Sequence, residues 1–370
     1  MQYNVNQTSG LQGNLLKPEI FQVLVNSYEV NPGVPFRKIY SFLTQRKTIC
    51  MTGTWGFAMA FYSWLKKLNN LSFPLKDYQS SRKNRENLRL MTANLMIRVQ
   101  DHGAALENAP EIPWLQGFYS EHKDFLIRFS DFLGMNGAWQ WFSNGIKFPV
   151  LEDKVHPFFG VYFPTRYEHL LLFDTWLSKN SSFGKALDIG TGCGILSLMM
   201  LKHSIPFVHA TDTNPNAVYS AGLEFKRKKL LSKIIIEQAS FVGSYESDGN
   251  DLIVFNPPWI PAQTSTELDL ATYYEPGFFE QFFTAVHNIM KPETTLAILF
   301  SDFATAAGVS TDHPIESEIQ NKKRFLLVEK LEAPITQRPS KRKGWLEEIR
   351  KREKVELWVM KAVKGTQHIK

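Results

Sequence analysis

Residues 185–202, which read KALDIGTGCGILSLMMLK, decide the fold of this chain. The apolar run at residues 185–189 predicts a short strand, and residues 195–202 predict a helix. The strand end and the loop after it hold Asp188, Gly190, Thr191, Gly192 and Gly194. Glycine permits a tight turn and lets a ligand approach the backbone without meeting a Cβ atom. This strand–loop–helix unit therefore predicts an α/β protein that binds a ligand at the carboxyl end of the strand.

The spacing of these glycines does not fit a dinucleotide-binding loop. That loop requires G-x-G-x-x-G, but the sixth position is Ile195 when counted from Gly190 and Ser197 when counted from Gly192. The helix behind the loop still offers free N–H groups and a positive dipole to a polar or anionic ligand. An acid followed by three alternating glycines resembles the loop that binds S-adenosylmethionine. Cys193 has no apparent partner base, so we expect it to be a packing residue.

The second predicted strand, residues 206–211, leads into Asp212-Thr213-Asn214. An acid at this strand end, roughly 20 residues beyond the glycine loop, can accept two hydrogen bonds from a ribose diol. We expect Asp212 to have this role. The alternative is that Asp212 or Asn214 only caps the helix predicted at residues 216–230.

The rest of the C-terminal half also alternates strands with helices. A further helix is predicted at residues 278–290, and further strands at residues 233–238, 251–255, 294–300, 325–328 and 355–360. This alternation predicts a doubly wound, Rossmann-like α/β fold with a seven-stranded sheet.

The segment Asn256-Pro257-Pro258-Trp259 follows the fourth predicted strand directly. Proline cannot donate to a sheet ladder, and two prolines in succession fix a rigid, extended loop. The Asn256 side-chain oxygen and the Pro257 carbonyl could each accept a hydrogen bond from a target NH₂ group and aim its lone pair at a methyl donor. Trp259 could stack on the planar group that carries this nitrogen. The alternative is an ordinary strand-to-loop exit, which Asn-Pro commonly starts.

Together, the glycine loop and the Asn-Pro-Pro-Trp segment resemble class I methyltransferases of the Asn-Pro-Pro-Tyr/Phe/Trp group. The resemblance covers residues 155–362 and is closest to the small methyltransferase domain and to release-factor glutamine methyltransferases. Phe163–Glu168, Ile260-Pro261 and Tyr274-Glu275-Pro276 also echo the latter group. The resemblance implies a target nitrogen on a planar system, such as an exocyclic amine of adenine or guanine or a glutamine side-chain amide.

The same resemblance implies S-adenosylmethionine as the cofactor. The implied catalytic residues are Asn256, Pro257, Pro258 and Trp259, and the implied cofactor site holds Asp188, Gly190, Thr191, Gly192, Gly194, Asp212, Asn214 and Asn256. Family members often carry an acid after the third strand that contacts the donor's adenine. The nearest residues here are Ser240 and Phe241, which we include in the predicted cofactor site, although the adenine contact itself stays open.

The aromatic-rich segment His156–Arg166 precedes the glycine loop. It could close over the donor and place Thr165 or Arg166 near the donor's carboxylate. It could equally be an interdomain linker that is packed by its aromatic residues. His156 has no companion at ligand spacing, so no metal is expected.

Residues 1–150 read as helical and aromatic, with little β signal. Helices are predicted at residues 56–68, 81–99 and 121–133. We therefore predict a mainly helical N-terminal domain at residues 1–150 that recognises the substrate, and a catalytic domain at residues 151–370. The first part is about twice the length that the resemblance to release-factor enzymes implies.

Composition constrains the setting. Two cysteines cannot build a disulfide framework, and the first ten residues lack the pattern of a signal peptide. The most apolar early stretch, residues 55–64, is too short for a membrane span. We therefore expect a cytoplasmic protein with no membrane partner.

The charge pattern bears on the substrate. The net charge of +6 favours an anionic partner weakly. The basic stretch at residues 338–354 could follow a phosphate backbone, or it could be a solvated helix balanced by its own glutamates. The basic residues 82–89 are similar in kind. We favour a nucleobase amine in RNA as the substrate, with a protein glutamine amide or a small planar molecule as alternatives.

Overall fold

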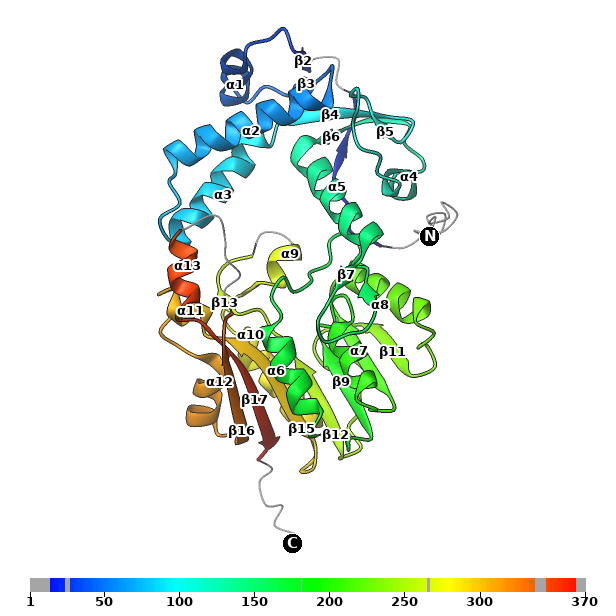
Figure 1. Ribbon diagram of the computed structural model, residues 1–370, viewed down its shortest axis with the longest axis vertical. Coiled ribbons are helices and arrows are strands. Elements are labelled where there is room, and N and C mark those ends of the chain that lie inside the picture. The colour runs from blue at the N-terminus through cyan, green and yellow to red at the C-terminus, as the bar shows by residue number, and fades with distance from the viewer. Residues whose placement is uncertain (1–13, 24–26, 181, 265–266, 337–343, 364–370) are drawn as a thin grey trace. The chain divides into compact units, whose positions relative to one another are not determined.

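Two units make up the chain, Met1–Ser143 and Asn144–Lys370, with a boundary slightly before the predicted one at residue 150. The computed structural model describes residues 14–23, 27–180, 182–264, 267–336 and 344–363 (Figure 1). Each unit is described below by itself.

The C-terminal unit alternates strands and helices, as predicted. Its elements are β7 (Ile146–Lys147), β8 (Lys154–Val155), α6 (Glu168–Leu177), β9 (Lys185–Ile189), α7 (Ile195–Lys202), β10 (Val208–Asp212), α8 (Pro215–Arg227), β11 (Ile234–Gln238), β12 (Asp251–Phe255), β13 (Ile260–Pro261), α9 (Glu267–Leu270), β14 (Tyr273–Tyr274), α10 (Phe278–Ile289), β15 (Thr295–Ser301), α11 (Phe303–Ala306), α12 (Pro314–Ser317), the π-helix η2 (Glu318–Lys322), β16 (Phe325–Pro334), α13 (Trp345–Arg350) and β17 (Lys354–Ala362).

Seven of these strands form one sheet in the order β11-β10-β9-β12-β15-β17-β16 (Figure 1). The first five strands run parallel to one another, and β17 runs antiparallel to both β15 and β16. The predicted seven-stranded α/β sheet is therefore confirmed. The connection between β16 and β17 includes α13. These two long strands pair antiparallel although no short hairpin turn joins them.

Helices cover both faces of this sheet because successive strand side chains point to opposite faces. On β9, Leu187 and Ile189 belong to the apolar cluster that Phe282 and Phe283 of α10 complete. Asp188, between them, instead hydrogen-bonds Ser197 of α7. The doubly wound arrangement thus follows from the alternation within a single strand.

The N-terminal unit contains more β structure than predicted. Its elements are β1 (Ile20–Phe21), β2 (Tyr28–Val30), α1 (Phe36–Thr44), β3 (Ile49–Met51), α2 (Trp55–Ser72), α3 (Tyr78–Thr92), β4 (Leu95–Gln100), β5 (Gly103–Ala104), α4 (Trp114–Phe118), β6 (Asp124–Arg128) and α5 (Phe129–Asn144). Five of its strands lie in the order β1-β6-β4-β3-β2, and β5 pairs with β4. The expectation of little β structure was therefore wrong, although the helices of this unit hold more residues than its strands, as predicted.

Two of the predicted helices conceal strands. The helix predicted at residues 81–99 ends at Thr92, and β4 follows; the helix predicted at residues 121–133 begins only at Phe129, after β6. Each strand contains three consecutive buried apolar residues, which are Leu95–Ile97 in β4 and Phe125–Ile127 in β6. A short apolar run buried on both faces has no period of two, so its pattern resembles part of a buried helix.

Candidate methyl-donor site

Strand register brings the predicted site residues to one edge of the sheet. Ile189, the last residue of β9, pairs with Thr211 of β10 on one side and with Phe255 of β12 on the other. The residues that follow these three positions, Gly190, Asp212 and Asn256, therefore leave the sheet side by side. All three line a cavity of about 550 Å³ at the carboxyl ends of the strands. This position and size are typical of a small-molecule site in an open α/β sheet.

The three loop glycines all have left-handed backbone conformations. The φ angles are 65° at Gly190, 55° at Gly192 and 84° at Gly194. A Cβ atom on Gly194 would lie 2.8 Å from Cε1 of Phe225, which is fully buried. The glycine requirement at Gly194 is thus steric as well as conformational. Gly190 and Gly192 line the cavity, whereas Gly194 only shapes the start of α7.

Asp188 supports the loop from behind and is not among the residues that line the cavity. Its Oδ2 accepts hydrogen bonds from Thr191 Oγ1 at 2.8 Å, from Ser197 N at 3.0 Å and from Ser197 Oγ at 2.5 Å. The residue is fully buried, and this burial raises the pKa of its carboxyl group to about 6. Asp188 therefore holds the loop through Oδ2, whereas its Oδ1 is buried without a partner among the described residues, and the contact that we predicted with the cofactor stays a prediction.

Asp212 faces the cavity and also orders the backbone around it. Its Oδ2 accepts from Gly192 N and its Oδ1 from Asn214 N, both at 2.9 Å. Burial raises the pKa of this carboxyl group. Each oxygen keeps a further lone pair, so two hydroxyl groups can still be bound. The helix cap that was the alternative role belongs to Asn214, whose Oδ1 accepts from Asn216 N at 2.9 Å.

The segment before the catalytic sheet is tied to the start of α8. Asn214 Nδ2 donates to Gly160 O at 2.9 Å, and Asn216 Nδ2 donates to Phe159 O at 2.8 Å. These bonds bring Tyr162 and Pro164 to the wall of the cavity. The segment is therefore part of the site and not only a linker.

Thr165 and Arg166 are not brought to the cavity wall. Thr165 is exposed and Arg166 is half-buried, and neither lines the cavity. Arg166 instead lies near Arg350: burial and the like charge of Arg166 lower the pKa of the Arg350 guanidinium. The cavity lining therefore does not support the contact that we predicted between these residues and the donor's carboxylate.

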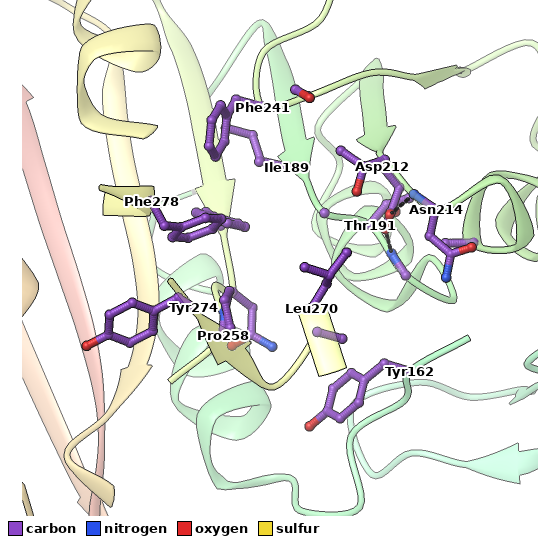
Figure 2. Close-up of a pocket in the computed structure, with 18 of the residues that line it drawn as sticks. Tyr162, Ile189, Thr191, Asp212, Asn214, Phe241, Pro258, Leu270, Tyr274 and Phe278 are labelled. Atoms are coloured by element: carbon purple, nitrogen blue, oxygen red, sulfur yellow. Dashed lines mark hydrogen bonds between the residues drawn. The ribbon is translucent and has the colours of Figure 1, made fainter. Parts of the chain in front are cut away.

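The cavity has a polar side and an apolar side. In Figure 2, Thr191, Asp212 and Asn214 lie on one side, and Phe241 and Phe278 lie on the other. Ser240 also lines the cavity. The ring centroids of Phe241 and Phe278 are 5.6 Å apart, and Thr211 Oγ1 fixes the loop by donating to Phe241 O at 2.6 Å. A ligand with a sugar at one end and a flat apolar ring at the other fits this division.

Only part of the Asn-Pro-Pro-Trp segment lines the cavity. Asn256 and Pro258 line the cavity, whereas Pro257 and Trp259 do not. The Oδ1 atom of Asn256 is buried and has no hydrogen-bond partner among the described residues. A buried acceptor without a donor is costly, so this atom is suited to receive one from a ligand.

The Trp259 indole packs away from the cavity. Its Nε1 donates to Leu299 O at 3.4 Å, and its ring meets the ring of His169 edge-on, with the centroids 5.3 Å apart. The stacking role that we predicted for Trp259 does not fit this placement. The indole instead anchors the rigid loop to the core, next to the fully buried His169.

A segment after β12 supplies several site residues that the predictions missed. Leu270, Tyr273, Phe278 and Gln281 line the cavity, as do Tyr274, Glu275 and Pro276 of the Tyr-Glu-Pro echo. The parallel pairing of β13 with β14 returns this segment to the cavity. Thr264 reinforces the return because its N and Oγ1 donate to Glu275 Oε1 at 3.1 and 2.6 Å. The resemblance of Tyr274-Glu275-Pro276 to release-factor enzymes was the one sequence feature that indicated this part of the site.

The basic stretch at residues 338–354 is described only from residue 344 onward. Its described part includes α13, which lies between β16 and β17 in the chain. Arg350 pairs with Glu353 at 3.5 Å and Lys351 with Glu348 at 2.5 Å. These ion pairs match the interpretation of a helix balanced by its own glutamates.

No described helix is long and apolar enough to cross a membrane. Among the same residues, no cluster of three or more His, Cys, Asp or Glu side chains has the arrangement of a metal site.

Comparison with known proteins confirms the predicted family resemblance for the core of this unit. A family model described as "Methyltransferase small domain" matches residues 169–305. The tRNA1(Val) (adenine(37)-N6)-methyltransferase of Dyadobacter fermentans is 28% identical over 120 residues, or 31% of this chain and 50% of that protein. The chain thus spans about half the length of this relative.

Two further matches were found. A Methanocaldococcus jannaschii protein, provisionally named a protein N5-glutamine methyltransferase, is 32% identical over 131 residues, or 34% of this chain and 59% of that protein. The solved structure of the m1A22 tRNA methyltransferase of Bacillus subtilis covers 55% of this chain and 68% of its own, with 13% identity and a TM-score of 0.34.

Proposed function

We propose that this chain is an S-adenosylmethionine-dependent N-methyltransferase that acts on an exocyclic nucleobase amine in RNA. The observation that carries the proposal is that Asn256 lines the cavity and that its buried Oδ1 has no hydrogen-bond partner among the described residues. A neutral acceptor in this position can bind the N–H of an amine without protonating or deprotonating it.

The cavity residues fit the parts of the donor. Asp212 would accept from the ribose hydroxyls, and the loop backbone at Gly190 and Gly192 would lie against the methionine part, near the N-terminus of α7. Phe241 and Phe278 would enclose the adenine. Ser240 lies at the same wall and could add a hydrogen bond to this ring.

Asn256 and Pro258 would hold the target nitrogen in line with the sulfonium methyl group. The lone pair of nitrogen forms the new N–C bond, the S–C bond breaks, and its electron pair stays on sulfur as a thioether. The methylated nitrogen then loses a proton to water, so a strong general base is unnecessary. Positioning supplies the catalysis, which explains why a rigid Pro-Pro loop carries the acceptor.

Two observations support RNA as the substrate class. The Dyadobacter fermentans relative, which is 28% identical over 31% of this chain, is named a tRNA adenine-N6 methyltransferase. The chain also carries a net charge of +6, which is complementary to a polyanion. Such a substrate would place the protein in the cytoplasm.

A protein glutamine amide is the second candidate. The Methanocaldococcus jannaschii relative is provisionally named for this activity, and the Tyr274-Glu275-Pro276 segment, which echoes release-factor enzymes, lines the cavity. An amide NH₂ would use the same Asn256 acceptor, so the two candidates differ in the macromolecule and not in the reaction.

Labelled methyl donor separates these candidates directly. The purified chain is incubated with donor and with RNA, protein or small-molecule fractions from a strain that lacks the gene. We expect label in RNA, with a yield that falls as salt rises. Label in a protein band would support the second candidate, and donor binding without transfer to any fraction would overturn the enzymatic proposal.

A further inference from the structure

Charge in the N-terminal unit is concentrated in one helical hairpin. The hairpin α2–α3, defined here as Trp55–Thr92, carries seven basic side chains and two acidic ones, which gives it a net charge of +5. The net charge of the whole chain is +6. The basic residues are Lys66, Lys67, Lys76, Arg82, Lys83, Arg85 and Arg89.

One of the two acids of the hairpin is engaged at a helix end. Asp77 is the N-cap of α3, and its Oδ1 accepts from Ser80 N at 2.7 Å in a capping box. Its carboxylate is therefore committed to the helix end. Glu86 is the other acid. All the basic residues are exposed except Arg82, which is half-buried.

Buried amides hold the hairpin in a defined shape. Asn69, which is fully buried, donates through Nδ2 to Asn84 O at 2.9 Å and accepts from Asn87 Nδ2 at 2.6 Å. Asn84 Nδ2 donates to Phe73 O at 2.7 Å and so fixes the turn between the helices. The exposed cations are therefore presented by a rigid scaffold, which lowers the entropy lost when a partner binds.

The arrangement on α3 matches a repeating anion. Arg82, Arg85 and Arg89 are spaced i, i+3 and i+7, so they form a row along one side of the helix. Arginine binds phosphate oxygens through a planar fork of donors. A polymer with regularly spaced phosphates can occupy such a row, whereas a single small anion would use only one position.

A cavity between α1 and the hairpin places aromatic rings beside the hairpin's cations. It measures about 270 Å³ and is lined by both aromatic rings and polar groups, among them Tyr40, Phe73 and Asn87. The Lys83 ammonium lies 5.8 Å from the centre of the Phe73 ring. Aromatic rings beside cations are typical of surfaces on which unpaired bases stack.

We propose that the α2–α3 hairpin binds the phosphodiester backbone of the RNA substrate. The proposal rests on the proposed function in one respect only, that the substrate is RNA. The hairpin supplies affinity that does not depend on base sequence, while the catalytic cavity selects the nitrogen.

The test uses the full chain and a fluorescein-labelled 20-nucleotide RNA of mixed sequence. The hairpin variant combines Lys66→Gln, Lys67→Gln, Arg85→Gln and Arg89→Gln, because glutamine keeps helix propensity. The control variant removes the same charge from exposed lysines elsewhere, through Lys123→Gln, Lys179→Gln, Lys226→Gln and Lys233→Gln. Fluorescence anisotropy gives Kd between about 50 and 200 mM salt.

We expect the hairpin variant to lose roughly tenfold or more in affinity at low salt, and its plot of log Kd against log salt to flatten by about two to three units if all four cations meet phosphates. The control variant should stay close to wild type. Equal losses in both variants, or an unchanged Kd and slope in the hairpin variant, would overturn the proposal. Binding to vesicles that contain anionic lipid, without binding to RNA, would overturn it as well.

Two further measurements keep the outcomes separate. Calorimetric binding of the methyl donor should be unchanged in the hairpin variant, which shows that the catalytic unit is folded. If the quadruple variant is unstable, the pairs Lys66→Gln/Lys67→Gln and Arg85→Gln/Arg89→Gln replace it, and each should give about half of the slope change. Hairpin-dependent RNA binding without methyl transfer to RNA would reject RNA as the methylated substrate but would still show that the hairpin binds an RNA backbone.

Discussion

The backbone N–H of Gly192 donates a 2.9 Å hydrogen bond to Oδ2 of Asp212, across the gap between the β9 and β10 strand ends. The residue that we assign to the ribose therefore also holds the glycine loop. The other oxygen of Asp212 accepts from Asn214 N, so the carboxylate is fixed before any donor arrives. Because the carboxylate is already held in place, a ligand can bind to it without the entropy cost of ordering the Asp212 side chain.

Replacing Asp212 should weaken donor binding. We expect Asp212→Ala to lose roughly 1–3 kcal/mol of affinity for S-adenosylmethionine, because hydrogen bonds to a charged acceptor disappear and the loop is released. Isothermal titration calorimetry measures this loss. Asp248→Ala, at an exposed acid of the same unit, is the matched control. An unchanged dissociation constant in Asp212→Ala would reject the ribose role.

Asn256 should matter for transfer and not for donor affinity. We expect Asn256→Ala to lower the single-turnover rate at least ~100-fold, a loss typical of removing a fixed group that binds the reacting centre. Donor affinity should change little. The variant Asn250→Ala, which removes a surface amide that donates to Ser182 O, serves as the control. Substantial transfer by Asn256→Ala would show that the buried oxygen does not hold the target amine.

Burial of His169 should make the catalytic unit sensitive to acid. Its two ring nitrogens have no hydrogen-bond partner among the described residues, and burial lowers the pKa of the ring from 6.5 to about 4. The neutral ring therefore stabilises the fold above pH 6.5, and this contribution is lost as the pH falls to 4. The shift corresponds to about 3 kcal/mol.

Urea unfolding at pH 7 and at pH 4 measures this effect against His169→Phe, which keeps a flat ring beside Trp259 but cannot be protonated. We expect the wild type to lose about 3 kcal/mol more than His169→Phe between the two pH values. The same loss in both proteins would mean that His169 is not buried as a neutral ring.

Gly194 should not tolerate a side chain. Alanine there would adopt a φ of 84° and place its Cβ 2.8 Å from Phe225, so we expect Gly194→Ala to destabilise the unit by roughly 2–4 kcal/mol. Gly222→Ala is the control, because that position lies inside α8 and a Cβ there meets nothing within 4 Å. The control should gain about 0.5–1 kcal/mol. Denaturant titration distinguishes the two, and equal stabilities would contradict the steric argument.

The sequence predicted those parts of the site that lie immediately after strands. Gly190, Asp212 and Asn256 could be assigned because a parallel sheet places consecutive strand ends at one edge. Trp259 was assigned to the wrong surroundings because a tetrapeptide does not reveal which side of a rigid loop faces the core. Tyr273 and Phe278 were missed because no local pattern indicates that β13 pairs with β14.

The sequence by itself determined the α/β sheet, the glycine loop and the residues that follow the strand ends. Each of these depends on periodicity or on the backbone freedom of a few residues. Only the tertiary structure decided how those groups are used. Within the stretch quoted first, Asp188 does not line the cavity and accepts a hydrogen bond from Ser197 of α7, while Gly190 and Gly192 line the cavity. The reason is physical: a strand fixes the spacing of its side chains, but the helices packed on each face determine which of them reach solvent and which are buried.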